Sequence, residues 1–443
     1  MKRIFLYLII CIGVLAACSD DDTFTTSRSN LLTFSKDTVK MDTVFSTVGS
    51  STYTFWVYNY SGDGIRLSSV RLKNGNQTGF RVNVDGSYLD NLMGAVATDL
   101  EVRKGDSIRV FVELTAAENN QDGPQLVEDD LLFLLESGVE QKVNLRSYAW
   151  DALQVRNLVV SKDTLIESAK PVVVYGDGIR VDSGAVLTLR NTTLYFHDGA
   201  GLAVRGTLRT ENVVMRGDRL DRMFDYLPYD RVSGQWQGIV FESPSVDNVL
   251  TDTEIRNAMT AVRVDSAALD STVQRLTMTR CVVHNAKGAG VVSINSHIGL
   301  YYCQLTNTYG DCLAVYGGRA DIDHCTLGQF YPFAADRGYA LVFSDAYDLK
   351  LVCNNSIVTG YADDEVMLYR SDDASRILEY SFSDCLLRTP AVEDDTLNFK
   401  RIQWETPKDS IQGKQHFVTI DETNLYYDFH LDSLSTAIGK GCY

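Results

Sequence analysis

The feature that most constrains the fold is a short motif that recurs at a fixed distance in the second half of the chain. The segments CVVHN, CQLTN and CTLGQ begin at Cys281, Cys303 and Cys325, and each begins 22 residues after the one before. Each has an aliphatic residue two places after the cysteine and an amide at its end, and this alternation is typical of strands. A constant period of this length indicates one structural unit stacked on copies of itself.

A coil of three short strands accounts for a unit of this length. The coils of a parallel β-helix stack about 4.8 Å apart, so equivalent side chains lie above one another. We therefore predict that Val283, Leu305 and Leu327 form one internal ladder. The cysteines, which pack as small apolar side chains, form the next ladder, so their spacing is explained without disulfide bonds. The amides at the corner are expected to hydrogen-bond from coil to coil.

Residues 30–150 show a different pattern. Segments such as STYTFWVYN, IRLSSVRL and DSIRVFVEL alternate apolar and polar residues and are separated by turn residues, which predicts an antiparallel β-sandwich of the Ig-like kind. The predicted fold class is therefore all-β, with this sandwich followed by a parallel β-helix over residues 151–443. The less regular stretch 390–443 is predicted to cap the end of the rod.

The start of the chain has the parts of an export signal, with a basic start and an apolar run before the sequence LAAC, which ends at Cys18. LAAC resembles the lipobox of bacterial lipoproteins, which implies a signal peptide over 1–17 and lipidation of Cys18 by acyl chains such as palmitate. The sequence SDDD that follows resembles the acidic export signal of Bacteroidota-type surface lipoproteins. We therefore expect an acidic tether over 18–29 and a lipid-anchored protein on the outer face of the outer membrane.

Other segments resemble Bacteroidota-type surface lipoproteins with a right-handed parallel β-helix of the pectate-lyase-like class. They are DTVKMDTVFSTVG near the start, WQGIVF at 236–241 with its long preceding loop, and the terminal YYDFHLDSLSTAIGKG. In the terminal segment, Thr436 and Gly439 replace the proline and aspartate of the family's pattern. The resemblance implies a right-handed helix and a surface location, but it implies no single activity.

The charge balance excludes one class of partner. The chain has 58 acidic and 41 basic residues, a formal net charge of −17. A nucleic-acid-binding protein carries a basic patch or stripe, so no nucleic-acid partner is expected. An acidic surface also repels polyanions such as uronate polymers, unless calcium or a local basic groove intervenes.

Candidates for catalysis are sparse. A β-helix polygalacturonase needs paired carboxylates, and NTYGDCLAV at 307–315 resembles its acidic motif with Asp311 alone. Asp363 and Asp364 in GYADDEVML are the other candidates, and together with Glu365 they offer carboxylates of the kind that binds calcium. The histidines show no metal-binding spacing, so no metal site or cofactor is predicted, with calcium at this acidic cluster as the alternative.

The loop RLDRMFDYLPYDRVSGQW is the richest in aromatic and charged side chains. Aromatic faces flanked by polar groups suit sugar rings or a protein partner. The alternative is a loop that buries its own aromatic rings against the rod. The predicted binding residues are Phe224, Tyr226, Tyr229, Asp230 and Trp236.

Three functions remain open. The leading hypothesis is a non-catalytic cell-surface lipoprotein, held to the membrane by its lipid anchor, whose β-helix binds a glycan or an envelope protein. The second is a polysaccharide lyase or glycoside hydrolase of the β-helix class. The third is a structural subunit of an outer-membrane complex.

Overall fold

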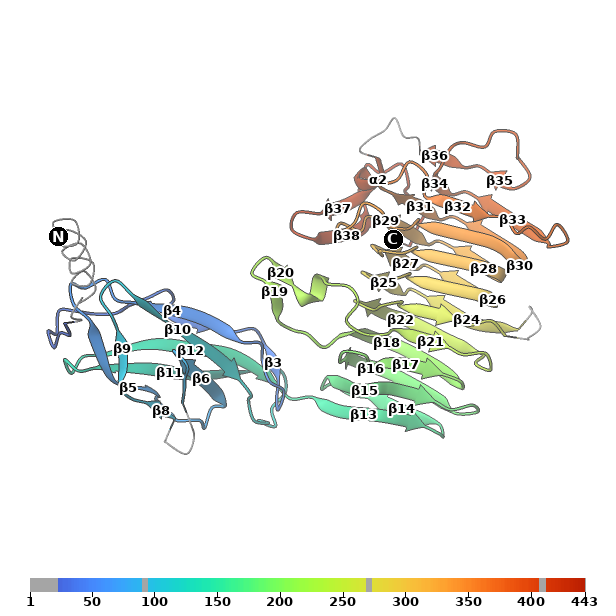
Figure 1. The fold of residues 1–443 in the computed structure, drawn as a ribbon. Helices are drawn as coiled ribbons and strands as arrows, with labels where there is room; N and C mark the ends of the chain where they lie inside the picture. The colour runs from blue at the N-terminus through green and yellow to red at the C-terminus, as the bar shows by residue number, and fades with distance from the viewer. Residues whose placement is uncertain (1–22, 90–94, 268–272, 406–411, 443) are drawn as a thin grey trace, which may run out of the picture. The chain divides into compact units, whose positions relative to one another are not determined.

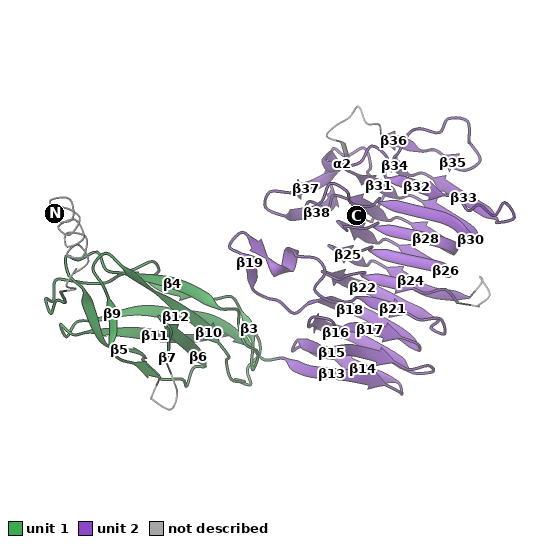
Figure 2. Ribbon diagram, in the orientation of Figure 1, with its two compact units in different colours: residues 1–151 green, residues 152–443 purple. Residues whose placement is uncertain are grey.

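The computed structural model describes residues 23–89, 95–267, 273–405 and 412–442. The chain divides into two compact units, residues 1–151 and 152–443, coloured separately in Figure 2. Nearly all regular structure is β, which confirms the predicted fold class. Among the described residues, no helix has the length and apolar character needed to cross a membrane.

Unit 1 is a sandwich of two sheets around one apolar core. Its strands alternate buried and exposed side chains, as in β10, because one face of each sheet packs inward. The first sheet is antiparallel and contains, in order, β1 (Thr33–Phe34), β4 (Tyr53–Tyr58), β10 (Ser107–Leu114), β6 (Phe80–Val84) and β7 (Ser87–Tyr88). The second contains β2 (Thr38–Lys40), β12 (Glu140–Trp150), β11 (Gln125–Leu135), β5 (Ile65–Leu72) and β8 (Val96–Ala97), with β3 (Val44–Phe45) and β9 (Leu100–Val102) at its edges.

Unit 2 is a stack of coils whose strands pair in parallel with those of the next coil, as Figure 1 shows. Together they form one 22-stranded sheet wound into a β-helix. Its first strands are β13 (Leu153–Val160), β14 (Thr164–Glu167), β15 (Val172–Val181), β16 (Val186–Phe196), β17 (Gly201–Val204), β18 (Thr207–Gly217), β21 (Ile239–Phe241), β22 (Asn248–Arg256), β23 (Val262–Val264), β24 (Gln274–Thr279) and β25 (Val282–His284). The rest are β26 (Val291–Tyr301), β27 (Gln304–Thr306), β28 (Leu313–Asp323), β29 (Thr326–Gln329), β30 (Leu341–Asn354), β31 (Ile357–Gly360), β32 (Val366–Tyr369), β33 (Leu378–Ser383), β34 (Leu386–Arg388), β35 (Phe399–Lys400) and β36 (Gln403–Glu405).

The predicted aliphatic ladder is present. Val283 pairs with Leu305, and Leu305 pairs with Leu327. The ladder extends in both directions beyond the repeated motif, from Ile255 before it to Val358 after it. All of these side chains are fully buried, because every second residue of each strand points into the rod. We call the face formed by the end of β22 and by β25, β27, β29, β31 and β34 the short-strand face.

The cysteines also stack as predicted. The thiols of Cys281, Cys303 and Cys325 each donate to a backbone carbonyl of the preceding coil, at 3.3, 3.4 and 3.4 Å respectively. All seven cysteines among the described residues are free. Packing and a weak S–H hydrogen bond therefore account for these residues.

The corner amides follow the prediction at Gln329 and depart from it at the two asparagines. The side-chain amide of Gln329 donates to the Gly310 carbonyl of the preceding coil at 2.8 Å. Asn285 and Asn307 adopt φ angles of 60° and 55°, a left-handed conformation that asparagine tolerates better than most residues. The coil-to-coil hydrogen bonds at this corner run from their backbone N–H groups to Thr306 and Gly328. Asparagine is suited to the corner by its backbone conformation, whereas the prediction assigned the hydrogen bond to its side chain.

Two irregular segments of unit 2 lie outside the stack. The first, which we call the insertion, is residues 218–235 and contains the hairpin β19 (Arg222–Phe224) and β20 (Leu227–Pro228) and the 3-10 turn η3 (Tyr229–Arg231). The second, which we call the C-terminal segment, is residues 412–442 and contains α2 (Gln412–Gln415) and the hairpin β37 (Phe417–Asp421) and β38 (Tyr426–Leu431).

The C-terminal segment packs against the side of the rod, whereas the sequence predicted a cap over its end. Phe417 and Phe429 bury their rings against Phe330, in a small core separate from the main one. The backbone N–H of Gly441 donates to the carbonyl of Asn355 at 2.8 Å. These rings find apolar partners along the short-strand face, while β35 and β36 stack on β33 and β34 as further strands of the rod.

Candidate functional site

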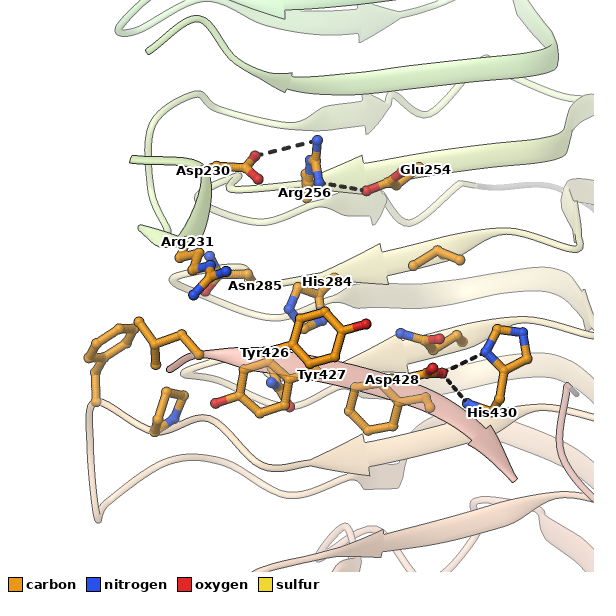
Figure 3. A pocket seen from close by; sticks show the side chains of 17 residues that line it. Asp230, Arg231, Glu254, Arg256, His284, Asn285, Tyr426, Tyr427, Asp428 and His430 are labelled. Carbon is orange, nitrogen blue, oxygen red and sulfur yellow. Dashed lines mark hydrogen bonds and ion pairs between the residues drawn. The ribbon is translucent and has the colours of Figure 1, made fainter. Parts of the chain in front are cut away.

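A groove of about 430 Å³ lies on the short-strand face between the two irregular segments, as Figure 3 shows. Its floor is made by outward-pointing side chains of the coils, and its walls come from the insertion, the C-terminal segment and the loop that follows β29. The lining residues are Asp230, Arg231, Glu254, Arg256, Val282, His284, Asn285, Gln304, Asn307, Pro332, Phe333, Leu425, Tyr426, Tyr427, Asp428, Phe429 and His430.

The floor follows directly from strand alternation. Ile255 and Val283 point inward, so Glu254, Arg256 and His284 on the same strands point outward. Arg256 lies one coil below His284, because the two residues are partners in the ladder between β22 and β25. The floor is therefore polar at the points where two successive coils present these side chains.

The walls carry the aromatic side chains. Tyr426 and Phe333 are 55% and 49% exposed. Tyr427 lies over His284, with ring centroids 5.7 Å apart, and stacks on Phe429. Figure 3 shows Tyr426 and Tyr427 beside His284 at the centre of the groove. The groove thus combines exposed rings with a polar floor.

Ion pairs hold the floor to the insertion. Asp230 is 2.8 Å from the guanidinium of Arg216 and 3.4 Å from that of Arg256. Arg256 also pairs with Glu254 at 3.1 Å. The guanidinium of Arg231 donates to the backbone carbonyl of Asn424, so the insertion also contacts the hairpin of the C-terminal segment. The two walls are therefore joined at one end of the groove.

The two histidines of the groove have different environments. The Nδ1 atom of His284 lies 2.9 Å from the Thr306 hydroxyl, and burial together with the nearby charge of Arg256 lowers the pKa of His284 to about 4. His430 is exposed, and its ring and backbone N–H both contact the Asp428 carboxylate, at 2.6 and 3.0 Å. These contacts lower the pKa of Asp428, because hydrogen bonds to the charged form favour it.

Of the five binding residues predicted from the sequence, Asp230 lines the groove. Phe224 and Tyr226 stack on each other at the hairpin of the insertion, 5.6 Å apart, with Tyr226 76% exposed. Tyr229 lies under the guanidinium of Arg219, 3.9 Å from it. These three residues lie outside the groove lining, and their part in binding stays a prediction.

The prediction for Trp236 is wrong. Its side chain is only 1% exposed and stacks on Phe196 at 4.2 Å, with the ring planes 10° apart. Its indole N–H donates to the carbonyl of Arg256 at 2.8 Å. Trp236 is therefore part of the rod's core, where it anchors the end of the insertion. Burying such a large ring stabilises the fold, and a buried ring cannot contact a ligand at the surface.

The three candidate catalytic carboxylates also lie outside the groove lining. Asp311 accepts a hydrogen bond from the backbone N–H of Tyr339 at 2.9 Å, and burial raises its pKa. Asp364 accepts one from the Thr389 hydroxyl at 2.7 Å. Burial raises the pKa of Tyr339, and the charges of Tyr369, Asp364 and Asp311 raise it further.

The acidic cluster at 363–365 does not form a calcium site. Asp363 is largely exposed, 3.7 Å from Arg388, and Asp364 is held by Thr389. Glu365 is buried, accepts hydrogen bonds from two backbone N–H groups, and has its pKa raised to about 8 by burial. The three carboxylates therefore point to different places. No group of three or more His, Cys, Asp or Glu side chains suited to a metal occurs among the described residues.

Sequence reasoning missed most of the groove. Glu254, Arg256 and His284 stand beside the inward residues of TEIRN and CVVHN, so the repeat itself marks them as outward-facing. No sequence pattern marks Tyr426, Tyr427 and Asp428 as groove residues, because only the path of the C-terminal segment brings them to this face. Cys18 and the predicted signal peptide lie outside the described residues.

Comparison with known proteins supports the fold of unit 2. The family model for the right-handed β-helix region matches residues 152–327, so this unit contains a right-handed parallel β-helix. No curated protein matches the chain.

Solved structures resemble the chain only distantly. The catalytic unit of a thermostable GH87 α-1,3-glucanase from Streptomyces thermodiastaticus shares 9% identity, with 80% of this chain and 89% of that one covered and a TM-score of 0.34. A family 123 glycoside hydrolase from Clostridium perfringens shares 8%, with 30% of each chain covered and a TM-score of 0.20. BcpA, the major pilin subunit of Bacillus cereus, shares 11%, with 31% and 44% covered and a TM-score of 0.18. The chain thus spans less than half the length of the last two proteins, and TM-scores this low support no functional argument.

Proposed function

We propose that this protein is a non-catalytic cell-surface lipoprotein that binds a glycan chain in the groove of unit 2. The observation that carries the proposal is the pair of exposed rings, Tyr426 and Phe333, beside a floor of polar side chains. Aromatic rings pack against the C–H faces of sugars, and amide and carboxylate groups hydrogen-bond to sugar hydroxyls. Exposed apolar groups beside polar ones are typical of a ligand-binding groove.

The charges of the groove favour binding over cleavage. A glycosidase needs one carboxylic acid with a raised pKa to protonate the leaving oxygen. In this groove Asp230 and Glu254 are paired with Arg256, and Asp428 is paired with His430. The pKa of Asp428 is lowered, which keeps it ionised. Carboxylates held in this way act as hydrogen-bond acceptors for a ligand.

The proposal is tested by measuring retention of the purified full chain, in detergent, on immobilised plant, algal and host polysaccharides. Tyr426→Ala should reduce retention about fivefold or more, since a stacked aromatic ring contributes about 1 kcal/mol or more. Tyr88→Ala removes a ring of similar exposure from unit 1 and should leave retention unchanged. Retention by no polysaccharide, together with co-purification of an outer-membrane protein, would contradict glycan binding and favour a protein partner or a structural role.

A second candidate, a glycoside hydrolase, is favoured by one observation. Asp311 is held by the backbone N–H of Tyr339 at 2.9 Å and burial raises its pKa, as the general acid of such an enzyme requires. New reducing ends on incubation with a polysaccharide, lost in Asp311→Asn but kept in Tyr426→Ala, would establish this activity. If Asp311→Asn releases as many reducing ends as the wild type, Asp311 is not a catalytic residue of this activity.

The lipid anchor and surface location complete the proposal. Cys18→Ala should abolish labelling by palmitate and move the protein out of the outer-membrane fraction. Digestion of the protein on intact cells by an added protease tests whether it faces outward. A mature protein that keeps residues 1–17 would contradict the anchor.

A further inference from the structure

The carboxylates on the floor of the groove and at its insertion wall are matched by guanidinium groups. Asp230 lies 2.8 Å from the guanidinium of Arg216 and 3.4 Å from that of Arg256. Arg256 also pairs with Glu254, at 3.1 Å. Two acids thus face two guanidinium groups, and neither sign of charge is left over in this part of the groove.

Arg231 is the charged group of the lining that has no such partner. The remaining lining carboxylate, that of Asp428, lies 2.6 Å from the ring of His430. The Nη1 group of Arg231 donates to the backbone carbonyl of Asn424, which is neutral. No carboxylate among the residues that the structure describes forms an ion pair with Arg231.

Asp421, on the same hairpin, is occupied by its own turn. Its carboxylate accepts hydrogen bonds from the backbone N–H groups of Thr423 and Asn424, both at 3.0 Å, and from the side-chain amide of Asn424 at 2.7 Å. The hydrogen bonds from Asn424 lower the pKa of Asp421, and the charge of Arg231 adds a smaller effect. The positive charge of Arg231 is therefore felt by this acid without being neutralised in an ion pair.

The single hydrogen bond of Arg231 leaves one edge of its guanidinium group open. The Nε and Nη2 groups on this edge have no partner among the described residues, and neither is a buried atom. Two parallel N–H groups of this kind bind a carboxylate, or the similar oxygens of a sulfate, through two hydrogen bonds. The bond from Nη1 to Asn424 already holds the guanidinium in place, which reduces the entropy lost when a ligand binds.

An exposed ring lies at the same hairpin as this guanidinium. Tyr426, which is 55% exposed, follows Asn424 by two residues. Figure 3 shows Arg231 in the same part of the groove as Asn285 and Tyr426. A sugar ring packed on Tyr426 would place an acidic substituent within reach of Arg231.

We infer that the groove binds a glycan that carries an acidic substituent, the carboxylate of a uronate or a sulfate ester, and that Arg231 determines this specificity. The inference rests on the proposed glycan-binding function and names the chemical class of the ligand. The chain as a whole is acidic, at −17. The attraction therefore acts at contact distance, because charges more than about 8 Å away are largely screened at physiological ionic strength.

The test uses pairs of ligands that differ in the acidic group. Oligogalacturonate is compared with its methyl ester, and a sulfated galactan oligosaccharide with the unsulfated one. Affinities are measured by calorimetric titration of the full chain in detergent, at about 0.15 M salt to screen the distant acids. We expect the acidic member of at least one pair to bind at least about tenfold more tightly, and that pair identifies the acid.

Arg231→Gln removes the charge and keeps an amide that can donate to the Asn424 carbonyl. It should reduce the ratio of acidic to uncharged affinity at least about tenfold, whereas general damage to the groove would weaken both members and preserve the ratio. Arg209→Gln is the matched control, because Arg209 is an exposed arginine of β18 outside the groove lining. It removes the same charge from the rod and should leave the ratio unchanged.

The possible failures are distinguishable. Equal or tighter binding of the uncharged member in both pairs, or retention of the chain by uncharged polysaccharides alone, would overturn the inferred specificity while leaving glycan binding intact. A preference for the acidic member that Arg231→Gln does not alter would overturn the assignment to Arg231. Binding of no member of either pair, nor of any polysaccharide tested above, would overturn the proposed function and the inference with it.

Discussion

The stacked coils of unit 2 and its two irregular segments are built on different principles. In the coils, every inward position is repeated by the next coil, as with Val283, Leu305 and Leu327. The insertion and the C-terminal segment have no such register, and each is held by a few particular contacts, such as that between Phe330 and Phe417. The coils form a rigid surface, and the irregular segments turn one part of that surface into a groove.

This difference separates stability from specificity. A flat face of repeated strands offers the same shallow surface along its length. The groove lies where the insertion and the hairpin of the C-terminal segment stand on either side of three successive coils. Inward side chains of the coils should therefore determine stability, whereas the outward side chains of the floor and those of the irregular segments should determine what is bound.

The largest expected effect is at the junction between the two kinds of structure. Trp236→Ala should lower the free energy of unfolding by about 3–5 kcal/mol, because it leaves a cavity beside Phe196 and removes the donor to the Arg256 carbonyl. Urea unfolding followed by circular dichroism measures this change. Unchanged stability with lost glycan retention would restore Trp236 as a binding residue.

Within the coils, Leu305→Ala should cost about 2–5 kcal/mol, since the side chain is fully buried between two other members of its ladder. Leu434→Ala in the C-terminal segment is the matched variant, because Leu434 is 89% exposed, and it should change stability by less than about 0.5 kcal/mol. Similar losses in both variants would contradict the division between the two kinds of structure.

The stability of the coils should also depend on pH, through the protonation of Glu365. Its pKa is about 8 in the folded protein, well above the value of about 4.3 expected when unfolded, so the folded state binds more protons between these values. Stability should therefore fall, by a few kcal/mol, as the pH rises from about 4.5 to about 8. Glu365→Gln should remove this fall, whereas Asp363→Asn, at an exposed site, should keep it.

The smallest expected effect on stability is at the hairpin of the insertion. Replacing both Phe224 and Tyr226 by Ala should change the free energy of unfolding by less than about 0.5 kcal/mol, since these rings pack mainly on each other in solvent. Glycan retention of the same variant tests their predicted part in binding. Retention equal to that of the wild type would confine binding to the groove.

The sequence predicts the structure of the stacked coils well and that of the two irregular segments poorly. The 22-residue spacing predicted the coils, the aliphatic ladder and the cysteine ladder, because a stack of parallel strands repeats its packing at every coil. The corner asparagines were located correctly, but their role depends on a φ angle that the residue type alone does not reveal. In the irregular segments the sequence indicated aromatic richness, but it did not distinguish the buried Trp236 from the exposed Tyr226.

The sequence by itself determined the architecture: an alternating N-terminal sandwich followed by a β-helix whose inward and outward positions can be counted from one motif. The tertiary structure alone decided the groove. It placed Tyr426 and Asp428 in the same groove as Glu254 and His284, although more than 140 residues separate the two pairs along the chain. The physical reason is that strand periodicity is local and repeats, whereas the path of the C-terminal segment depends on where Phe417 and Phe429 find apolar partners on the side of the rod.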